Sequence, residues 1–390
     1  MDREKPIILS LTGEKSHAVT IPLGQGSFAL GALGMDAKKY DVLVDHKLPL
    51  NWEAFNLLFT PHGKEHQELN PFGDWPRNFY YWGNDARFIP WSEKREIEGF
   101  TWSPLQATTA DFTKSKIGGL TINADAYNIK LKFGNHRAVS LTGNLHHIAV
   151  SKTGNIATLS FFPKTEKKNK TNYQLPNFEA FKDITSLDIT VTPLGQPFDC
   201  ESLLQFKNLT SLSLSGNYTN LNCLEHFVDL ERLAIRYAPN LQQLPALKSW
   251  KKLTSFIGWN IEEIQGNLLR NELKAIKKER ELNYSTVSQL RKLIWFSTEY
   301  GIPFAAWEGK NAKTAVKNYK ATLKKIKKAK TEKEAKEVLT EFVNVFNNLP
   351  QIETTEREDI GEAVYQLRQV ASFEIDAKTA MQWFDDVRDY

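Results

Sequence analysis

The sequence of 390 residues predicts an α+β fold in which a β-rich N-terminal region runs into a short array of repeats, followed by a C-terminal helical bundle. Two observations carry this prediction. One short apolar pattern returns four times between Ile184 and Trp259, and such internal repetition dictates architecture. After Trp259 the apolar residues recur at a helical spacing rather than at alternate positions. We therefore divide the chain into residues 1–116, 117–265, 266–303 and 304–390.

The repeat places its apolar residues at fixed intervals. It reads Ile184-x-x-Leu187-x-Ile189, Leu209-x-x-Leu212-x-Leu214, Leu230-x-x-Leu233-x-Ile235 and Leu253-x-x-Phe256. Alternating apolar residues indicate a short strand with one side against a core, and neighbouring units then stack. Because one unit cannot bury its own apolar edge, we expect the flanking regions to cover both ends of the array.

This pattern, with Asn217 after the second unit, resembles the leucine-rich repeat, whose first segment reads L-x-x-L-x-L-x-x-N. The resemblance covers residues 184–259 and implies a short leucine-rich-repeat solenoid with an exposed strand face. The gross plan is also similar to that of uncharacterised bacterial repeat proteins, some of which are immunity or regulatory partners of toxins. That similarity implies a toxin or effector protein as the partner.

The residues between the apolar positions are predicted to form the exposed face of the strands. Small polar residues there give way to arginine and aromatic side chains, which concentrate binding energy in protein interfaces. We predict that a partner protein contacts Asp188, Ser213, Ser215, Arg232, Arg236, Tyr237 and Trp259. No serine, cysteine or carboxylate pair stands beside a recognisable base in a motif. The sequence therefore predicts a non-catalytic interaction protein that needs no cofactor and no metal.

The region before the repeats is predicted to be rich in strands. Apolar segments with glycine-bearing turns precede Asn51, and they indicate short strands. Residues 51–102 are dense in tryptophan and proline, and we interpret their aromatic side chains as the core of an irregular segment rather than a ligand groove. Alternating segments from Ile117 to Phe162, separated by Gly-Asn pairs, predict either hairpins or tight solenoid coils.

One motif in this region suggests a nucleotide-dependent enzyme as an alternative function. The run Gly24-Gln25-Gly26-Ser27-Phe28-Ala29 matches the dinucleotide-binding fingerprint, whose glycine loop opens onto a helix that receives the pyrophosphate. Pro22 interrupts the strand that should precede it, and Gly31 and Gly34 interrupt the helix that should follow. We therefore favour glycine turns in a β-rich region.

A second motif suggests a metal. The run His62-Gly63-Lys64-Glu65-His66 satisfies the H-x-x-E-H string of one metallopeptidase class. That chemistry requires both histidines on one face of a helix, and Pro61 and Gly63 argue against a helix there. We do not predict a metal site.

The C-terminal part is predicted to be helical. Apolar stripes predict helices through Leu269–Ile276, Val287–Ile294 and Val316–Ile326. Two further helices are predicted to begin at the capping boxes Thr331–Glu334 and Thr355–Glu358, because threonine followed three residues later by glutamate satisfies the first free N–H groups of a helix.

Lysines dominate one part of this helical region, which makes nucleic-acid binding through a lysine-rich helix a second alternative. Eleven lysines and two acids lie between Lys310 and Lys336. They occupy the polar side of an amphipathic pattern that contains no arginine, which favours a solvated face over a nucleic-acid partner.

Composition points to the cytoplasm. The formal net charge of +4 does not by itself imply a nucleic-acid partner. The first residues lack the basic segment and apolar core of a signal peptide, and no stretch approaches the roughly 18 apolar residues of a membrane helix. Two cysteines, Cys200 and Cys223, are interpreted as reduced and buried. The sequence therefore predicts a cytoplasmic protein without a membrane partner.

Overall fold

We describe the protein from a computed structural model, which places residues 6–22, 25–58, 76–165, 171–191, 196–291, 296, 304, 307, 309–350 and 352–390. The chain forms two compact units, Met1–Leu290 and Arg291–Tyr390.

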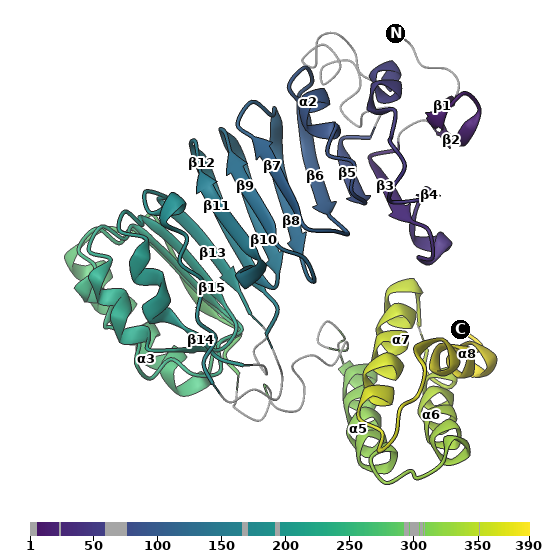
Figure 1. The fold of residues 1–390 in the computed structure, drawn as a ribbon. Coiled ribbons are helices and arrows are strands. Elements are labelled where there is room, and N and C mark those ends of the chain that lie inside the picture. Colours follow the sequence, from purple (N-terminus) through teal and green to yellow (C-terminus); the bar gives the residue numbers. More distant parts are fainter. Residues whose placement is uncertain are drawn as a thin grey trace. The chain divides into compact units, whose positions relative to one another are not determined.

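One sheet of twelve parallel strands runs through the first unit (Figure 1). Its strand order is β19-β18-β17-β15-β13-β12-β10-β8-β6-β5-β3-β4, and every neighbouring pair is parallel. In chain order these strands are β3 (Ser27–Ala32), β4 (Val42–Val44), β5 (Asn78–Trp82), β6 (Ile97–Ser103), β8 (Ile117–Ala124), β10 (His136–Gly143), β12 (Ile156–Pro163), β13 (Ser186–Thr190), β15 (Ser211–Ser215), β17 (Arg232–Arg236), β18 (Ser255–Trp259) and β19 (Tyr284–Ser288).

This sheet corrects the predicted fold class. The fold is α/β with one continuous parallel sheet, and the expected α+β arrangement, a β-rich region running into a leucine-rich-repeat solenoid, is wrong. Strands β8, β10 and β12 pair in register with one another and then with β13, so the strands before the repeats belong to the same sheet as the repeats. The hairpin alternative for residues 117–162 is also wrong, because hairpin strands would be antiparallel.

The chain reaches each new parallel strand by crossing to the other side of the core and returning, as parallel pairing requires. Between β6 and β12 the return path forms a second parallel sheet of β7 (Thr108–Phe112), β9 (Ile129–Phe133) and β11 (Ile148–Lys152). In later turns it contains the strand pair β14 (Phe198–Asp199) and β16 (Tyr218–Thr219) and short 3-10 helices, η4 (Glu179–Phe181), η5 (Cys200–Gln205), η6 (Leu221–His226) and η7 (Leu247–Ser249). Further 3-10 turns are η1 (Ala37–Lys39), η2 (Trp52–Leu58) and η3 (Leu145–His147).

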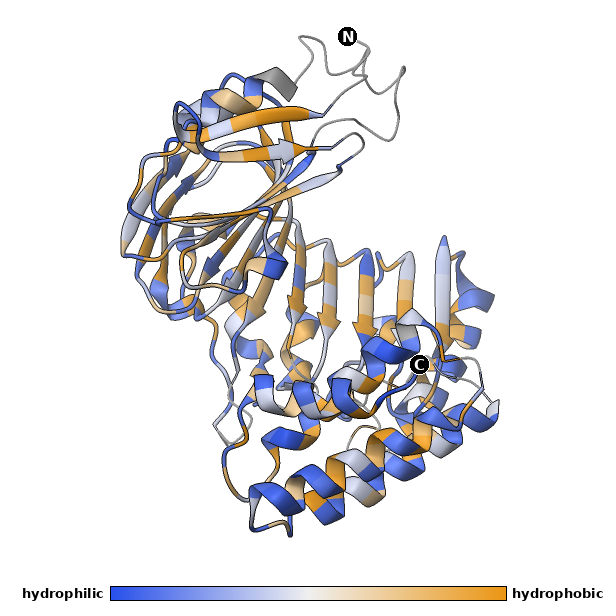
Figure 2. Cartoon of the chain, turned by 90° about the vertical axis from the view of Figure 1, so that its right-hand side faces the viewer, coloured by the Kyte–Doolittle hydropathy of each residue, from blue (hydrophilic) through white to orange (hydrophobic). Residues whose placement is uncertain are grey.

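The core of the first unit lies between the large sheet and these return segments. Aromatic rings stack along it, with centroid separations of 4.3 Å between Phe88 and Phe100 and 6.1 Å between Phe112 and Phe133. Figure 2 shows the matching alternation of apolar and hydrophilic residues along the strands. Most described aromatic residues of segment 51–102 are buried, which confirms them as core, although strands β5 and β6 replace the irregular segment that we expected.

Both ends of the large sheet have neighbours. An antiparallel ribbon of β1 (Ile7–Gly13) and β2 (Ser16–Ile21) contacts η2 and β4, and the short helix α2 (Phe88–Ser92) follows β5. At the opposite end α3 (Glu263–Glu279) packs against β19, which confirms the helix predicted through Leu269–Ile276. The helix predicted to start at Val287 is wrong there, since Val287 lies on β19.

The second unit is helical. It contains α5 (Gly309–Ile326), α6 (Glu332–Asn347), α7 (Thr354–Gln369) and α8 (Ala377–Val387). Thr331 caps α6 as predicted, because its hydroxyl accepts a hydrogen bond from Glu334 N at 3.3 Å. Helix α7 is capped two residues earlier than predicted: its N-cap is Glu353, whose N–H donates to Glu356 at 3.2 Å. Among the helices that the structure describes, none has the length and apolarity to span a bilayer.

Candidate functional site

Side chains on β13, β15, β17 and β18 that point away from the core form aligned rows on what we call the outer face of the large sheet. Cross-strand neighbours on this face are Ser211 and Arg232, Ser213 and Ala234, Ser215 and Arg236, and Arg236 and Trp259. The buried leucine and isoleucine residues on the opposite side fix this register, because a slip by one residue would turn them to solvent. We call Asp188, Ser213, Ser215, Arg232, Arg236, Tyr237 and Trp259 the docking patch.

Three residues of the docking patch form a polar cluster. Arg236 Nη1 donates a hydrogen bond to Ser213 Oγ at 3.1 Å. On the adjacent strand β13, Asp188 accepts a hydrogen bond from Ser160 Oγ at 3.5 Å. Burial raises the pKa of Asp188, while the hydrogen bond from Ser160 and the charge of Arg236 act in the opposite direction. The cluster therefore holds the Arg236 guanidinium in place on the outer face.

Two further residues of the patch form an aromatic pair at the ends of β17 and β18. The rings of Tyr237 and Trp259 have centroids 5.0 Å apart, and Tyr237 N–H donates to the Trp259 carbonyl at 3.0 Å. Tyr237 has a left-handed backbone, with φ of 51°. Positive φ also occurs at the ends of other strands of the sheet, at Gly143, which ends β10, and at Gly216, Asn260 and Gln289, which follow β15, β18 and β19.

This backbone conformation is unfavourable for tyrosine. The left-handed region suits glycine and asparagine, whereas most other residues lose about 1 kcal/mol there. A bulky aromatic residue at such a position is a local cost to folding, and such costs concentrate at functional sites.

The remaining two patch residues differ in their surroundings. Arg232 is exposed, and among the described residues none makes a hydrogen bond or an ion pair with its guanidinium. Ser215 is half-buried between Thr190 and Arg236. The structure thus places all seven residues on one stretch of the outer face, with one cation held by partners and one free for an incoming group.

The outer face also continues across strands where we predicted no site. Tyr80 on β5, Thr101 on β6, Thr121 on β8 and Ser140 on β10 occupy equivalent positions in the register. The sequence signal for this extension is the same apolar pattern at earlier positions: Ile97-x-x-Phe100-x-Trp102, Ile117-x-x-Leu120-x-Ile122 and Ile156-x-x-Leu159-x-Phe161.

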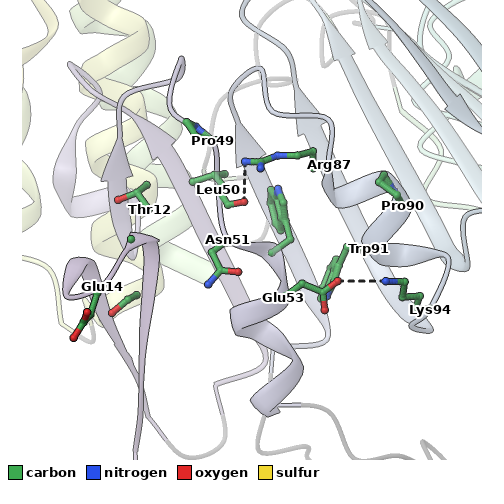
Figure 3. A pocket seen from close by; sticks show the side chains of 13 residues that line it. Thr12, Glu14, Pro49, Leu50, Asn51, Glu53, Arg87, Pro90, Trp91 and Lys94 are labelled. Carbon is green, nitrogen blue, oxygen red and sulfur yellow. Dashed lines mark hydrogen bonds and ion pairs between the residues drawn. The ribbon is translucent and has the colours of Figure 1, made fainter.

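A separate cavity of about 710 Å³ lies at the N-terminal end of the sheet (Figure 3). Three of its four charged lining residues have partners: Arg87 pairs with Asp85 at 2.8 Å, and Lys94 lies 3.7 Å from Glu53, while Glu14 is exposed. Arg87 also donates to the Leu50 carbonyl at 3.0 Å. Because both cations of the cavity are already paired within the chain, the cavity is a weaker candidate than the outer face.

The described part of the dinucleotide motif does not have the required geometry. Gly24 lies outside the described residues, and Ser27–Ala32 is strand β3 rather than a helix whose N-terminus could receive a phosphate. The histidines of His62–His66 also lie outside the described residues. Within the described ranges, no group of three acidic, histidine or cysteine side chains is placed to bind a metal.

Two other predicted features have clear positions. The lysines of α5 lie mostly on its exposed side, and Lys325 pairs with Glu341 of α6 at 2.6 Å. Cys200 and Cys223 are free thiols in buried positions, as predicted. Burial raises the pKa of Cys223 to about 12, so its reactive thiolate is scarce at neutral pH.

Three kinds of comparison with known proteins complete this description. No protein-family model, no curated protein and no solved structure matches the chain.

Proposed function

We propose that this protein is a non-catalytic docking protein that binds a partner protein on the outer face of its parallel sheet, through the docking patch. The observation that carries the proposal is Tyr237, an aromatic residue in a left-handed conformation beside Trp259. For the fold, the ring contact of Tyr237 with Trp259 only offsets the backbone cost of tyrosine at this position, whereas a binding surface gains a large rigid side chain.

The chemistry of the patch supports this role. Arginine, tyrosine and tryptophan are the residues that most often dominate the energy of protein interfaces. Here Arg236, Tyr237 and Trp259 adjoin small side chains such as Ser213 and Ser215, over which a partner can pack closely. The pairing of Arg236 with Ser213 fixes the guanidinium before binding, which lowers the entropy that association would otherwise cost.

Charge points to an acidic surface on the partner. Arg232 is exposed and free among the described residues, and Arg236 lies across the strand pair from Ser215. Arginine binds carboxylates through two parallel hydrogen bonds, which gives both energy and orientation. Within the same proposal the partner is a toxin or effector protein, and the site of action is the cytoplasm, where the free thiols Cys200 and Cys223 would stay reduced.

The test begins with capture of partners from the native cell extract with nuclease present, followed by mass spectrometry. The captured protein is then purified, and its affinity is measured for the wild-type chain and for Trp259→Ala and Arg236→Glu. We expect each substitution to weaken binding at least tenfold while leaving the circular dichroism spectrum unchanged.

Tyr127→Ala provides a matched control, because Tyr127 is an exposed aromatic residue in the turn between β8 and β9. Its removal should leave the affinity unchanged. Equal affinity for the wild type, Trp259→Ala and Arg236→Glu would show that the docking patch is not the binding site.

A further inference from the structure

A hollow of about 290 Å³ opens on the outer face where β5, β6, β8 and β10 run side by side. Tyr80, which is 39% exposed, stands on its β5 side. Three hydroxyl side chains in one row across the strands, Thr101, Thr121 and Ser140, form part of its lining, and Arg137 of β10 also borders it. The hollow thus combines one aromatic ring, a row of hydroxyls and a guanidinium.

Gly119 leaves this hollow open, whereas the side chain of Asn78 fills the place that a Cβ on Gly99 would take. Gly99 and Gly119 are paired in the register at a row that carries serine or arginine on β13, β15 and β17. Neither glycine has a positive φ, so their backbone conformation is open to other residues. A Cβ added at Gly119 would meet its nearest neighbour, the Glu98 carbonyl, at 3.4 Å, which is an ordinary contact. The fold therefore tolerates alanine at Gly119. Glycine is nevertheless present there, even though it weakens a strand relative to alanine.

The charge in the hollow is unbalanced. Glu98 is paired with Arg77, with Nε and Oε2 3.4 Å apart. Among the described residues no side chain forms an ion pair or hydrogen bond with the Arg137 guanidinium. Arg137 lies over β8, since its Nη2 would be 4.0 Å from a Cβ added at Gly118. The hollow is therefore lined by one carboxylate that is already paired, that of Glu98, and by the unpaired guanidinium of Arg137, which lies beside Gly118.

Size and position decide which anion fits. A hollow of about 290 Å³ is at the lower limit for a small-molecule site, but it suffices for one side chain and its adjoining backbone. Glycine in a strand interior allows another backbone to approach closely. The hollow lies on the same face of the sheet as the docking patch, and four strand-to-strand steps, about 20 Å at the usual strand spacing, separate β10 from β17.

We propose that this hollow receives an aspartate or glutamate side chain on an extended segment of the partner protein, with the carboxylate bound by Arg137 and the backbone lying over Gly119. The proposal rests on the proposed function, because it assigns a second contact to the same partner. The hydroxyls of Thr101, Thr121 and Ser140 supply hydrogen bonds to the segment, and Tyr80 covers one end.

The hollow is tested with a defined probe, the blocked peptide acetyl-Ser-Gly-Asp-Gly-Ser-amide, added to the full chain labelled with 15N-glycine. We expect saturable shifts of the Gly99 and Gly119 amide signals, the latter identified by its absence in Gly119→Ala. The same peptide with asparagine in place of aspartate should bind at least tenfold more weakly, and Arg137→Gln should remove the shifts. Glucuronate, a carboxylate without a peptide backbone, should cause no saturable shift.

Two controls separate binding from folding. Gly119→Ala should melt at the same or a higher temperature than the wild type, since alanine restricts the unfolded chain, and yet should fail to bind the peptide. Gly26→Ala, where an added Cβ meets nothing within 4 Å, should bind it normally. The proposal is overturned by the absence of saturable shifts, by equal binding of the asparagine peptide or glucuronate, or by unchanged binding to Gly119→Ala.

This outcome is distinguishable from failure of the proposed function. If Trp259→Ala weakens the affinity for the purified partner and Gly119→Ala does not, the docking patch is the binding site and the hollow is not a second contact. If neither variant weakens the affinity for the partner, the proposed function itself is wrong.

Discussion

Tyr237 and Trp259 meet edge to face, with ring planes at 82°, at the point where two adjacent parallel strands end. Tyr237 holds this position with a left-handed backbone. The contact between the rings is worth about 0.5–1.5 kcal/mol, which is close to the conformational cost of tyrosine in this region. Folding is therefore nearly indifferent to this side chain.

The first prediction follows from that balance. Tyr237→Gly should change the free energy of unfolding by less than about 1 kcal/mol, because relief of the backbone cost offsets the lost ring contact. The same variant should bind the partner at least tenfold more weakly. Urea denaturation and a binding titration measure the two quantities. A large loss of stability with unchanged affinity would assign Tyr237 a purely structural role.

The second prediction concerns Asp188, whose pKa is raised by burial. An acid with a raised pKa in the folded state binds protons more readily when folded. Its ionisation therefore opposes folding once the pH rises above the pKa that the group has in the unfolded chain. Asp188→Asn should therefore stabilise the protein at pH 7, by up to about 1 kcal/mol. It should also release Arg236 from its nearby negative charge. Denaturation curves at pH 4 and pH 7 test the sign, and a gain that is no larger at pH 7 than at pH 4 would contradict it.

The third prediction concerns His136, a buried histidine on β10. Its Nδ1 lies 2.7 Å from the Ile117 carbonyl and donates to it, and burial lowers the pKa of the ring. A lowered pKa means that the stabilising neutral form is complete above the ordinary histidine pKa of about 6.5 and is lost as the pH falls through the folded value.

The free energy of unfolding should therefore decline between pH 7 and pH 5, by at most about 1.4 kcal/mol for each unit of pKa shift. In His136→Gln this decline should be smaller, since the variant cannot titrate there. Tryptophan fluorescence during urea denaturation at several pH values provides the comparison. Identical pH dependence in both proteins would exclude His136 as the cause.

The fourth prediction concerns the thiols of Cys200 and Cys223. Both are buried, and burial raises the pKa of each. A disulfide-exchange reagent such as dithiobisnitrobenzoate should modify neither thiol in the native protein at pH 8, because little thiolate is present and access is blocked. Both should react in concentrated guanidinium chloride. Rapid modification of the folded protein would show that η5 or η6 opens locally.

Sequence patterns predicted the local structure of the repeats well. Leu212, Leu233 and Phe256 alternate with polar residues, and the structure buries them on the core side of β15, β17 and β18. The alternation alone determines which side chains face outward, so the docking patch could be assembled from the sequence. Its significance for binding stays a prediction.

The extent of the sheet could not be predicted in the same way. On β10 the leading apolar position of the repeat is taken by His136, and on β6 the later positions are Phe100 and Trp102, so the pattern departs from leucine. Gly-Asn pairs between these strands also occur in hairpins, and sequence alone does not separate the two geometries. Strand direction is a property of long-range pairing, which local patterns do not encode.

Short apolar runs were a second source of error. Val287 and Leu290 fit a helical stripe, but Val287 lies on an added strand beside β18, where pairing with the existing sheet outweighs helical propensity.

The spacing of the parallel strands also sets the distances between sites on the outer face. From β5 to β19 each turn of the chain adds one strand, so points on different strands of the outer face are separated, across the strands, by a whole number of steps of about 4.8 Å. The gap between the hollow over Gly119 and the aromatic pair at Tyr237 is therefore fixed by the number of intervening turns, and gain or loss of one turn would change it by a single step. A partner that contacts both points would therefore bind only a sheet with the right number of strands between them.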